Sequence, residues 1–102
     1  MLEHAYTIEE ELVIAERADL VVRGLTLGVV TDGEAIAVLR AARLCATRTS
    51  PNVSAGINSA RRDVAIASLG LIEALKKNRP RDKNIELMLK AVEAWNRELA
   101  AL

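Results

Sequence analysis

The side chains best suited to bind a ligand are arginines in the middle of the chain. Four of them form two close pairs, Arg40 with Arg43 and Arg61 with Arg62. If residues 32–48 and 52–78 are helices joined as a hairpin, both pairs reach the same height in the fold. Four guanidinium groups at one level repel one another unless negative charge lies among them. The pattern therefore indicates either a pocket for a small anionic ligand, such as a phosphate, a carboxylate or a nucleotide, or an internal network of ion pairs.

A buried glutamate could supply the negative charge of an internal network. Glu11 shares a helix face with Ile14 and Ala18, so we expect its carboxylate to point toward the core. A buried carboxylate needs a partner, and arginine can supply a bidentate one. We expect Arg43 to lie nearest Glu11, with the other three arginines around them. We favour this network over the ligand pocket.

The sequence offers few residues for metal binding or catalysis. The chain has one histidine, His4, and one cysteine, Cys45, far apart in sequence. A zinc site therefore lacks the several ligands that it needs, and a Cys–His catalytic pair would require the N-terminal tail to fold back onto Cys45. The acidic run 9–11 could bind Mg²⁺ as in all-α nucleotide hydrolases, but the second helix offers acids only at its start. The run is better explained by the helix dipole, which favours acidic side chains near a helix N-terminus. We predict no catalytic residue, metal site or cofactor; catalysis stays open, and a non-catalytic protein is favoured.

Four helices must position these side chains. Apolar residues recur at spacings of three and four over residues 8–27, 32–48, 52–78 and 83–101. Thr7 with Glu10 and Thr31 with Glu34 have the spacing of capping boxes. No strand alternation occurs, and the connections are short. We therefore predict one domain over residues 1–102, an all-α antiparallel four-helix bundle of the up-down-up-down type.

The core of this bundle must be built from small and aliphatic side chains. Phenylalanine is absent, and Tyr6 and Trp95 are the only aromatic residues. The apolar faces that we expect to be buried are Ile14, Ala18, Val21 and Leu25 in the first helix; Ala35, Val38, Leu39, Ala42, Cys45 and Ala46 in the second; Val53, Ile57, Ala60, Val64, Ala67, Leu71 and Ala74 in the third; and Ile85, Met88, Val92, Trp95, Leu99 and Leu102 in the fourth.

A second apolar line on the first helix indicates a partner. Val13, Leu20 and Leu27, with Gly24 beside them, lie well round the helix from its core face. A helix in a four-helix monomer normally buries one face. The second face predicts another contact, most often with a second copy of the chain, so we expect a homo-oligomer and favour a dimer.

Charge and hydropathy exclude several partners. The 14 basic and 14 acidic residues balance, although residues 1–35 carry a net charge of −6 and residues 36–83 one of +7. No set of aromatic residues is available for base stacking, so we do not expect extended nucleic acid to bind. The longest apolar stretch is interrupted by polar and glycine residues, and the N-terminus does not resemble a signal peptide. We expect a cytoplasmic protein with no membrane partner.

One segment shows a likeness to a known family. Residues Ala60-Arg61-Arg62-Asp63-Val64, continuing to Leu71 and Ala74, resemble the central helix of phage proteins that sequester cyclic-nucleotide defence signals, which are small helical oligomers. The likeness ends there, and no site residue follows from it. From the residues we expect a non-catalytic helical protein that acts through oligomerisation and through protein or ligand binding. The alternative is a binder of a small anionic ligand or nucleotide through the arginines of the second and third helices.

Overall fold

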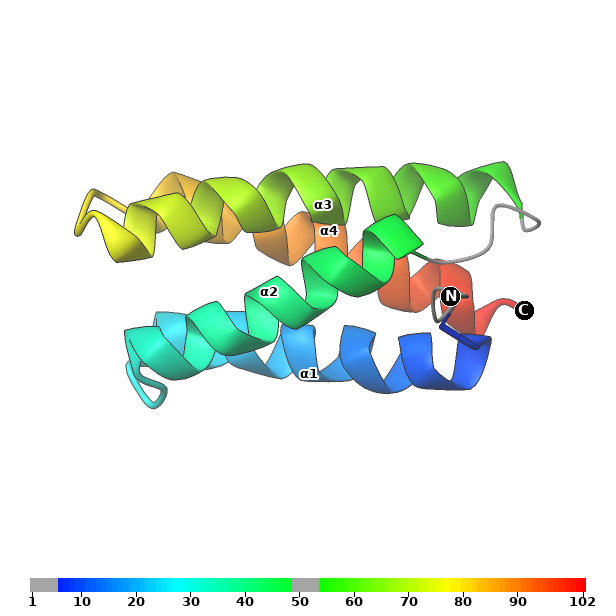
Figure 1. Ribbon diagram of the computed structural model, residues 1–102, viewed down its shortest axis with the longest axis horizontal. Coiled ribbons are helices and arrows are strands. Elements are labelled where there is room, and N and C mark those ends of the chain that lie inside the picture. Colours follow the sequence, from blue (N-terminus) through cyan, green and yellow to red (C-terminus); the bar gives the residue numbers. More distant parts are fainter. Residues whose placement is uncertain (1–5, 49–53) are drawn as a thin grey trace, which may run out of the picture.

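The computed structural model describes residues 6–48 and 54–102, which fold into helices packed around one core (Figure 1). The helices are α1 (Ile8–Leu27), α2 (Asp32–Arg48), α3 (Ala55–Lys76) and α4 (Asp82–Ala100). Each runs antiparallel to the next along the chain, which confirms the predicted four-helix bundle. Residues 52 and 53, expected at the start of the third helix, lie outside the described residues.

Each helix packs against two neighbours. α1 contacts α2 and α4, and α3 contacts the same two helices from the other side. Among the described residues, no Cα atom of α1 comes within 8 Å of one in α3, and the same is true of α2 and α4. Only long side chains can therefore connect helices that lie diagonally across the bundle.

The helix ends follow the local signals of the sequence. The backbone N–H of Glu10 donates to Thr7 Oγ1 at 3.1 Å, and the N–H of Thr7 donates to Glu10 Oε1 at 2.9 Å. Thr31 and Glu34 repeat this exchange at the same distances, and the hydrogen bond from the Thr31 backbone lowers the pKa of Glu34. Both capping boxes are confirmed.

The turn between α3 and α4 differs from the prediction. α3 ends at Lys76, because Asn78 adopts φ +51°, a left-handed conformation that asparagine tolerates. α4 begins at Asp82, one residue before the predicted start, and no side chain caps this helix at Arg81. The Arg81 guanidinium instead donates twice to Asp32, over 2.8 and 3.0 Å, which lowers the pKa of that carboxyl. This pair ties the start of α2 to the start of α4.

The core combines small side chains from α1 with larger ones from the other helices. Ala15, Ala18 and Val22 form the fully buried line of α1, whereas the expected Ile14, Val21 and Leu25 are only partly buried against its edges. The buried faces of the other helices include Leu39, Cys45, Ile57, Val64, Leu71, Met88, Val92, Trp95 and Leu99, but Leu102 is exposed.

Candidate functional site

A buried carboxylate holds three helices together near one end of the bundle. Glu11 of α1 has no exposed surface. Its Oε1 accepts from Arg61 Nη2 of α3 at 2.6 Å, and its Oε2 accepts from Arg61 Nε at 2.8 Å. Trp95 Nε1 of α4 also donates to Oε2, at 2.7 Å. We call these three residues the Glu11 network.

The partner of Glu11 is therefore Arg61, and the expectation that Arg43 lies nearest to it is wrong. Arg61 lies on the core face of α3, since it comes four residues after Ile57 and three before Val64, and both are fully buried. Its long side chain crosses the bundle diagonal that no backbone contact bridges. Arg43 is exposed, because it lies on the side of α2 away from the buried Ala42 and Cys45.

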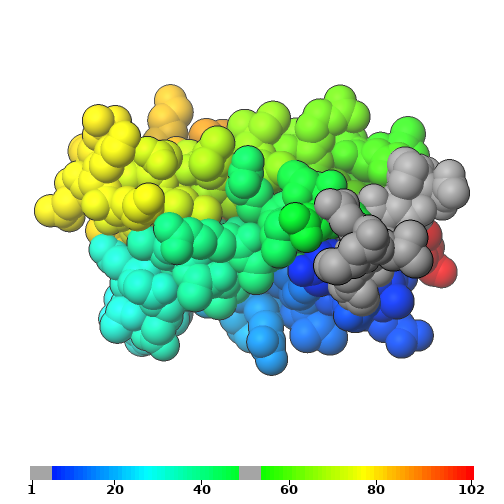
Figure 2. All heavy atoms as spheres, in the orientation of Figure 1, coloured from blue at the N-terminus to red at the C-terminus, as the bar shows by residue number. Residues whose placement is uncertain are grey.

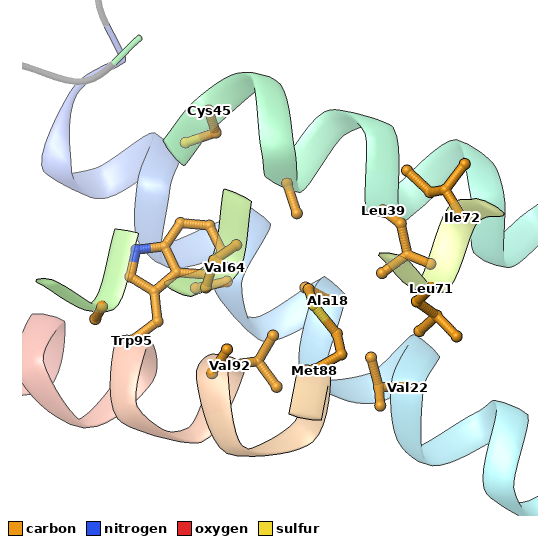
Figure 3. Close-up of a cluster of buried hydrophobic side chains, with 14 of the residues drawn as sticks. Ala18, Val22, Leu39, Cys45, Val64, Leu71, Ile72, Met88, Val92 and Trp95 are labelled. Carbon is orange, nitrogen blue, oxygen red and sulfur yellow. The ribbon is translucent and has the colours of Figure 1, made fainter. Parts of the chain in front are cut away.

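The network is fully satisfied by hydrogen bonds. Arg61 Nη1 also donates to Asn58 Oδ1, at 3.3 Å. Among the described residues, no buried side-chain nitrogen or oxygen lacks a hydrogen-bond partner. Figure 3 shows Trp95 reaching from α4 across to Val64 of α3, with Cys45 of α2 above its ring. Side chains of all four helices come together here. The negative charge on Glu11 is balanced by Arg61 of the same chain.

The remaining arginines do not form one cluster. Arg40 and Arg43 line a hollow of about 400 Å³ between α2 and α3. Figure 2 shows α2, coloured cyan to green, in front, with α3 in green to yellow beside it. Arg62 is exposed and does not line this hollow. Of the four predicted ligand-binding arginines, the structure brings together only two.

The α2–α3 hollow gains a cation that the sequence did not single out. Lys76 of α3 lines it, together with the apolar side chains of Leu44, Leu69 and Ile72. Glu73 lines it as well, but Lys77 Nζ lies 2.9 Å from its carboxylate and lowers its pKa. Glu73 is thus ionised at neutral pH. Its single negative charge is outnumbered by the three cations, so the hollow has a net positive charge. The lining of the hollow is therefore partly apolar and partly basic.

The residues that could carry out catalysis are dispersed. The three acids of the run 9–11 have different roles: Glu10 caps α1, Glu11 is buried and Glu9 is exposed. Burial, helped by the nearby Glu11 charge, raises the pKa of the Cys45 thiol to about 12. Such a thiol is a poor nucleophile at neutral pH. His4 lies outside the described residues.

No metal site is visible in the described part of the chain, where no group of three or more His, Cys, Asp or Glu side chains could hold an ion. Comparison with known proteins adds nothing to this geometry. No family model, curated protein or solved structure matches the chain. The surfaces of the chain itself must therefore indicate its function.

The most exposed apolar surface lies on α1. Val13 is 52% exposed, Leu20 68% and Leu27 74%, and all three point away from the buried Ala15, Ala18 and Val22. We call them the outer face of α1. They belong to the oligomer contact predicted from the sequence, and the monomer leaves them uncovered.

Gly24 differs from the other three residues predicted for this contact, because its own chain buries it. A Cβ atom at Gly24 would come within 2.8 Å of Val30 Cγ1 and 3.6 Å of Val29 Cγ2. The turn after α1 therefore packs onto this glycine. Val29 is itself 73% exposed, so it adds apolar surface beside the outer face.

A second exposed apolar patch lies between α3 and α4. Ile66 and Leu87 border a hollow of about 330 Å³ with Ala67 and Ala91 at its base. Two charged side chains, Asp63 and Lys90, also line this hollow. No helix in the described residues is long and apolar enough to traverse a lipid bilayer.

Proposed function

We propose that this protein is a non-catalytic binding module that works as a homodimer in the cytoplasm, with the outer face of α1 as the contact between copies. The observation that carries the proposal is the exposure of Val13, Leu20 and Leu27 on the side of α1 opposite the core. Packing the outer face of α1 against a second copy would remove three large side chains from water. Symmetric dimers are the commonest assemblies of soluble proteins.

The internal role of Glu11 supports a binding module over an enzyme. The strongest candidate for an acid–base group, the buried carboxylate, is held by Arg61 and by the Trp95 indole. These partners fix it in the core, and Glu11 lines none of the four hollows described between the helices of residues 6–48 and 54–102. The network therefore stabilises the bundle that presents the surfaces, and the surfaces bind.

Leu20→Glu should shift the protein toward monomer, because it places a charge at the centre of the outer face. Light scattering over a range of protein concentrations measures the shift. Leu20 is already 68% exposed in the monomer, so the substitution should leave the helical signal in circular dichroism intact. A wild-type protein that remains monomeric at high micromolar concentration would show that this proposal is wrong.

The matched control places the same charge on the other exposed patch. Leu87 is 51% exposed on α4, where it borders the hollow between α3 and α4 rather than the outer face of α1. Leu87→Glu should therefore leave the dimer intact. If Leu87→Glu abolished the dimer and Leu20→Glu did not, the contact would lie at the hollow between α3 and α4 instead.

We infer a second candidate function from the α2–α3 hollow: binding of a small anion by Arg40, Arg43 and Lys76. Three cations beside apolar side chains favour an anion that also carries apolar surface, such as a nucleotide. Arg61 does not contribute to this site, because it is paired with Glu11. Anion binding ranks second for that reason.

A thermal-shift screen of phosphate, pyrophosphate and ATP at low salt tests the hollow. A ligand at 100 times its Kd stabilises the folded state by about 2.7 kcal/mol, a shift of several degrees in Tm. Arg43→Met should remove most of the shift, and Arg62→Met, which changes an arginine outside the hollow, should keep it. If no anion raises the Tm of the wild type, the hollow does not bind anions of this kind.

A further inference from the structure

The outer face of α1 has a symmetry that defines how two copies can meet. Val13 and Leu27 each lie seven residues from Leu20, one on either side. Seven residues correspond to two turns, or about 10.5 Å along the helix. Reversing the helix about Leu20 therefore superimposes the apolar line on itself. Two copies of α1 packed antiparallel would place Leu20 against Leu20, and Val13 of each copy against Leu27 of the other.

The charges beside this line have the same symmetry. Glu16 and Arg23 are seven residues apart and so lie on one flank of the outer face. Glu16 comes four residues before Leu20, and Arg23 comes three after it. In the antiparallel arrangement, Glu16 of one copy lies opposite Arg23 of the other, and the pairing occurs twice. A parallel arrangement would set Glu16 against Glu16 and Arg23 against Arg23.

Both charged side chains can reach a second copy. Glu16 is exposed and has no ion-pair partner among the described residues. Arg23 binds Asp19 through Nε and Glu93 through Nη2, each at 3.0 Å. An arginine has five N–H donors, and neither of these contacts uses Nη1. The same arginine can therefore hold α1 to α4 within its own chain and bind Glu16 of a second chain.

We propose that two copies of this chain pair through α1 in an antiparallel, two-fold symmetric contact, with Leu20 on the axis and two Glu16–Arg23 pairs beside it. This inference depends on the proposed function and adds the direction and register of the contact. These charges favour a second copy over another apolar partner, since Glu16 and Arg23 of one copy face Arg23 and Glu16 of an antiparallel second copy.

Disulfide trapping tests the register. Leu20→Cys should form a cross-linked dimer on mild oxidation, because the two new thiols lie on the axis. Val13→Cys and Leu27→Cys should each stay uncross-linked alone and form a disulfide when mixed. Native Cys45 is buried, with a pKa of about 12, so it will not interfere. Lys83→Cys, on the exposed start of α4, is the control and should not cross-link.

Charge reversal tests the flank independently. Glu16→Arg makes the flank wholly basic and Arg23→Glu makes it wholly acidic, so each variant should dimerise about tenfold more weakly than wild type. Mixed in equal amounts, the two should restore the dimer, which light scattering measures. Circular dichroism confirms that both remain folded, since Arg23→Glu also removes the Asp19 and Glu93 contacts.

The outcomes separate this inference from the proposal beneath it. A monomeric wild type would overturn both. A dimeric wild type in which Val13→Cys cross-links with itself would overturn the antiparallel register alone. A dimeric wild type in which none of the α1 cysteines cross-links, and in which mixing the charge variants restores nothing, would move the contact away from α1.

Discussion

Arg61→Met should destabilise the folded protein by about 3–5 kcal/mol, because it leaves the Glu11 carboxylate buried with no cation beside it. The side chain of Arg61 is 5% exposed and that of Glu11 is fully buried, so water cannot replace the lost partner. A loss of this size is a large part of the stability of a small domain, which is typically about 5–15 kcal/mol. Chemical denaturation followed by circular dichroism measures the change.

Removing the stranded charge should recover much of the loss. In the double variant Glu11→Leu with Arg61→Met, both charges are gone and apolar side chains of similar size fill the site. Recovery should be incomplete, because Trp95 Nε1 then lacks the acceptor it has at 2.7 Å, which costs about 1–3 kcal/mol. Adding Trp95→Phe removes that donor and should recover part of the remainder.

The control for this series is the arginine that the sequence assigned to Glu11. Arg43 is exposed on the rim of the α2–α3 hollow, so Arg43→Met should change the free energy of unfolding by less than about 0.5 kcal/mol. If Arg43→Met is as damaging as Arg61→Met, or if the double variant is no more stable than Arg61→Met alone, then the Glu11 network does not hold the bundle as described.

Trp95→Ala should cost about 3–5 kcal/mol. Trp95 is the largest of the fully buried side chains, and in a core of alanines and aliphatic residues no neighbour is large enough to fill the space. The substitution also removes one of the hydrogen bonds to Glu11. The shift in the denaturation midpoint, at constant slope, gives the loss of stability.

Two variants identify the source of this loss. Trp95→Phe keeps most of the apolar volume and removes the N–H, so it should cost far less than Trp95→Ala. Leu87→Ala removes apolar volume from a half-exposed site on the same helix and should cost well under half as much as Trp95→Ala. A midpoint for Trp95→Ala close to that of wild type would contradict the burial of this residue.

The sequence predicts the helices well because their signals are local. Capping boxes, the left-handed Gly28 at φ +72° and the spacing of Met88, Val92, Trp95 and Leu99 each involve residues within a turn or two of one another. The burial of Glu11 follows in the same way from its position on α1. These features depend on the geometry of one helix, which the order of residues determines.

The partner of Glu11 could not be predicted in this way, because it depends on how four helices are arranged. Placing Arg43 beside Glu11 assumed that neighbouring helices supply the partner, whereas Arg61 reaches it from the diagonal helix. The position of Arg61 between Ile57 and Val64 was the available signal. An arginine on a core face needs an acid, and Glu11 was the acid already expected inside.

The same network has a consequence for the rate at which the fold is lost. Most helix contacts in the bundle join consecutive helices, but Glu11 meets Arg61 and Trp95 across 50 and 84 residues of chain. Contacts between such distant residues tend to form late in folding, after local structure has closed the intervening chain. Interactions that are absent from the transition state slow unfolding and leave the folding rate almost unchanged. We therefore expect the Glu11 network to set the lifetime of the folded protein, and the local helix pairs to set how fast it forms.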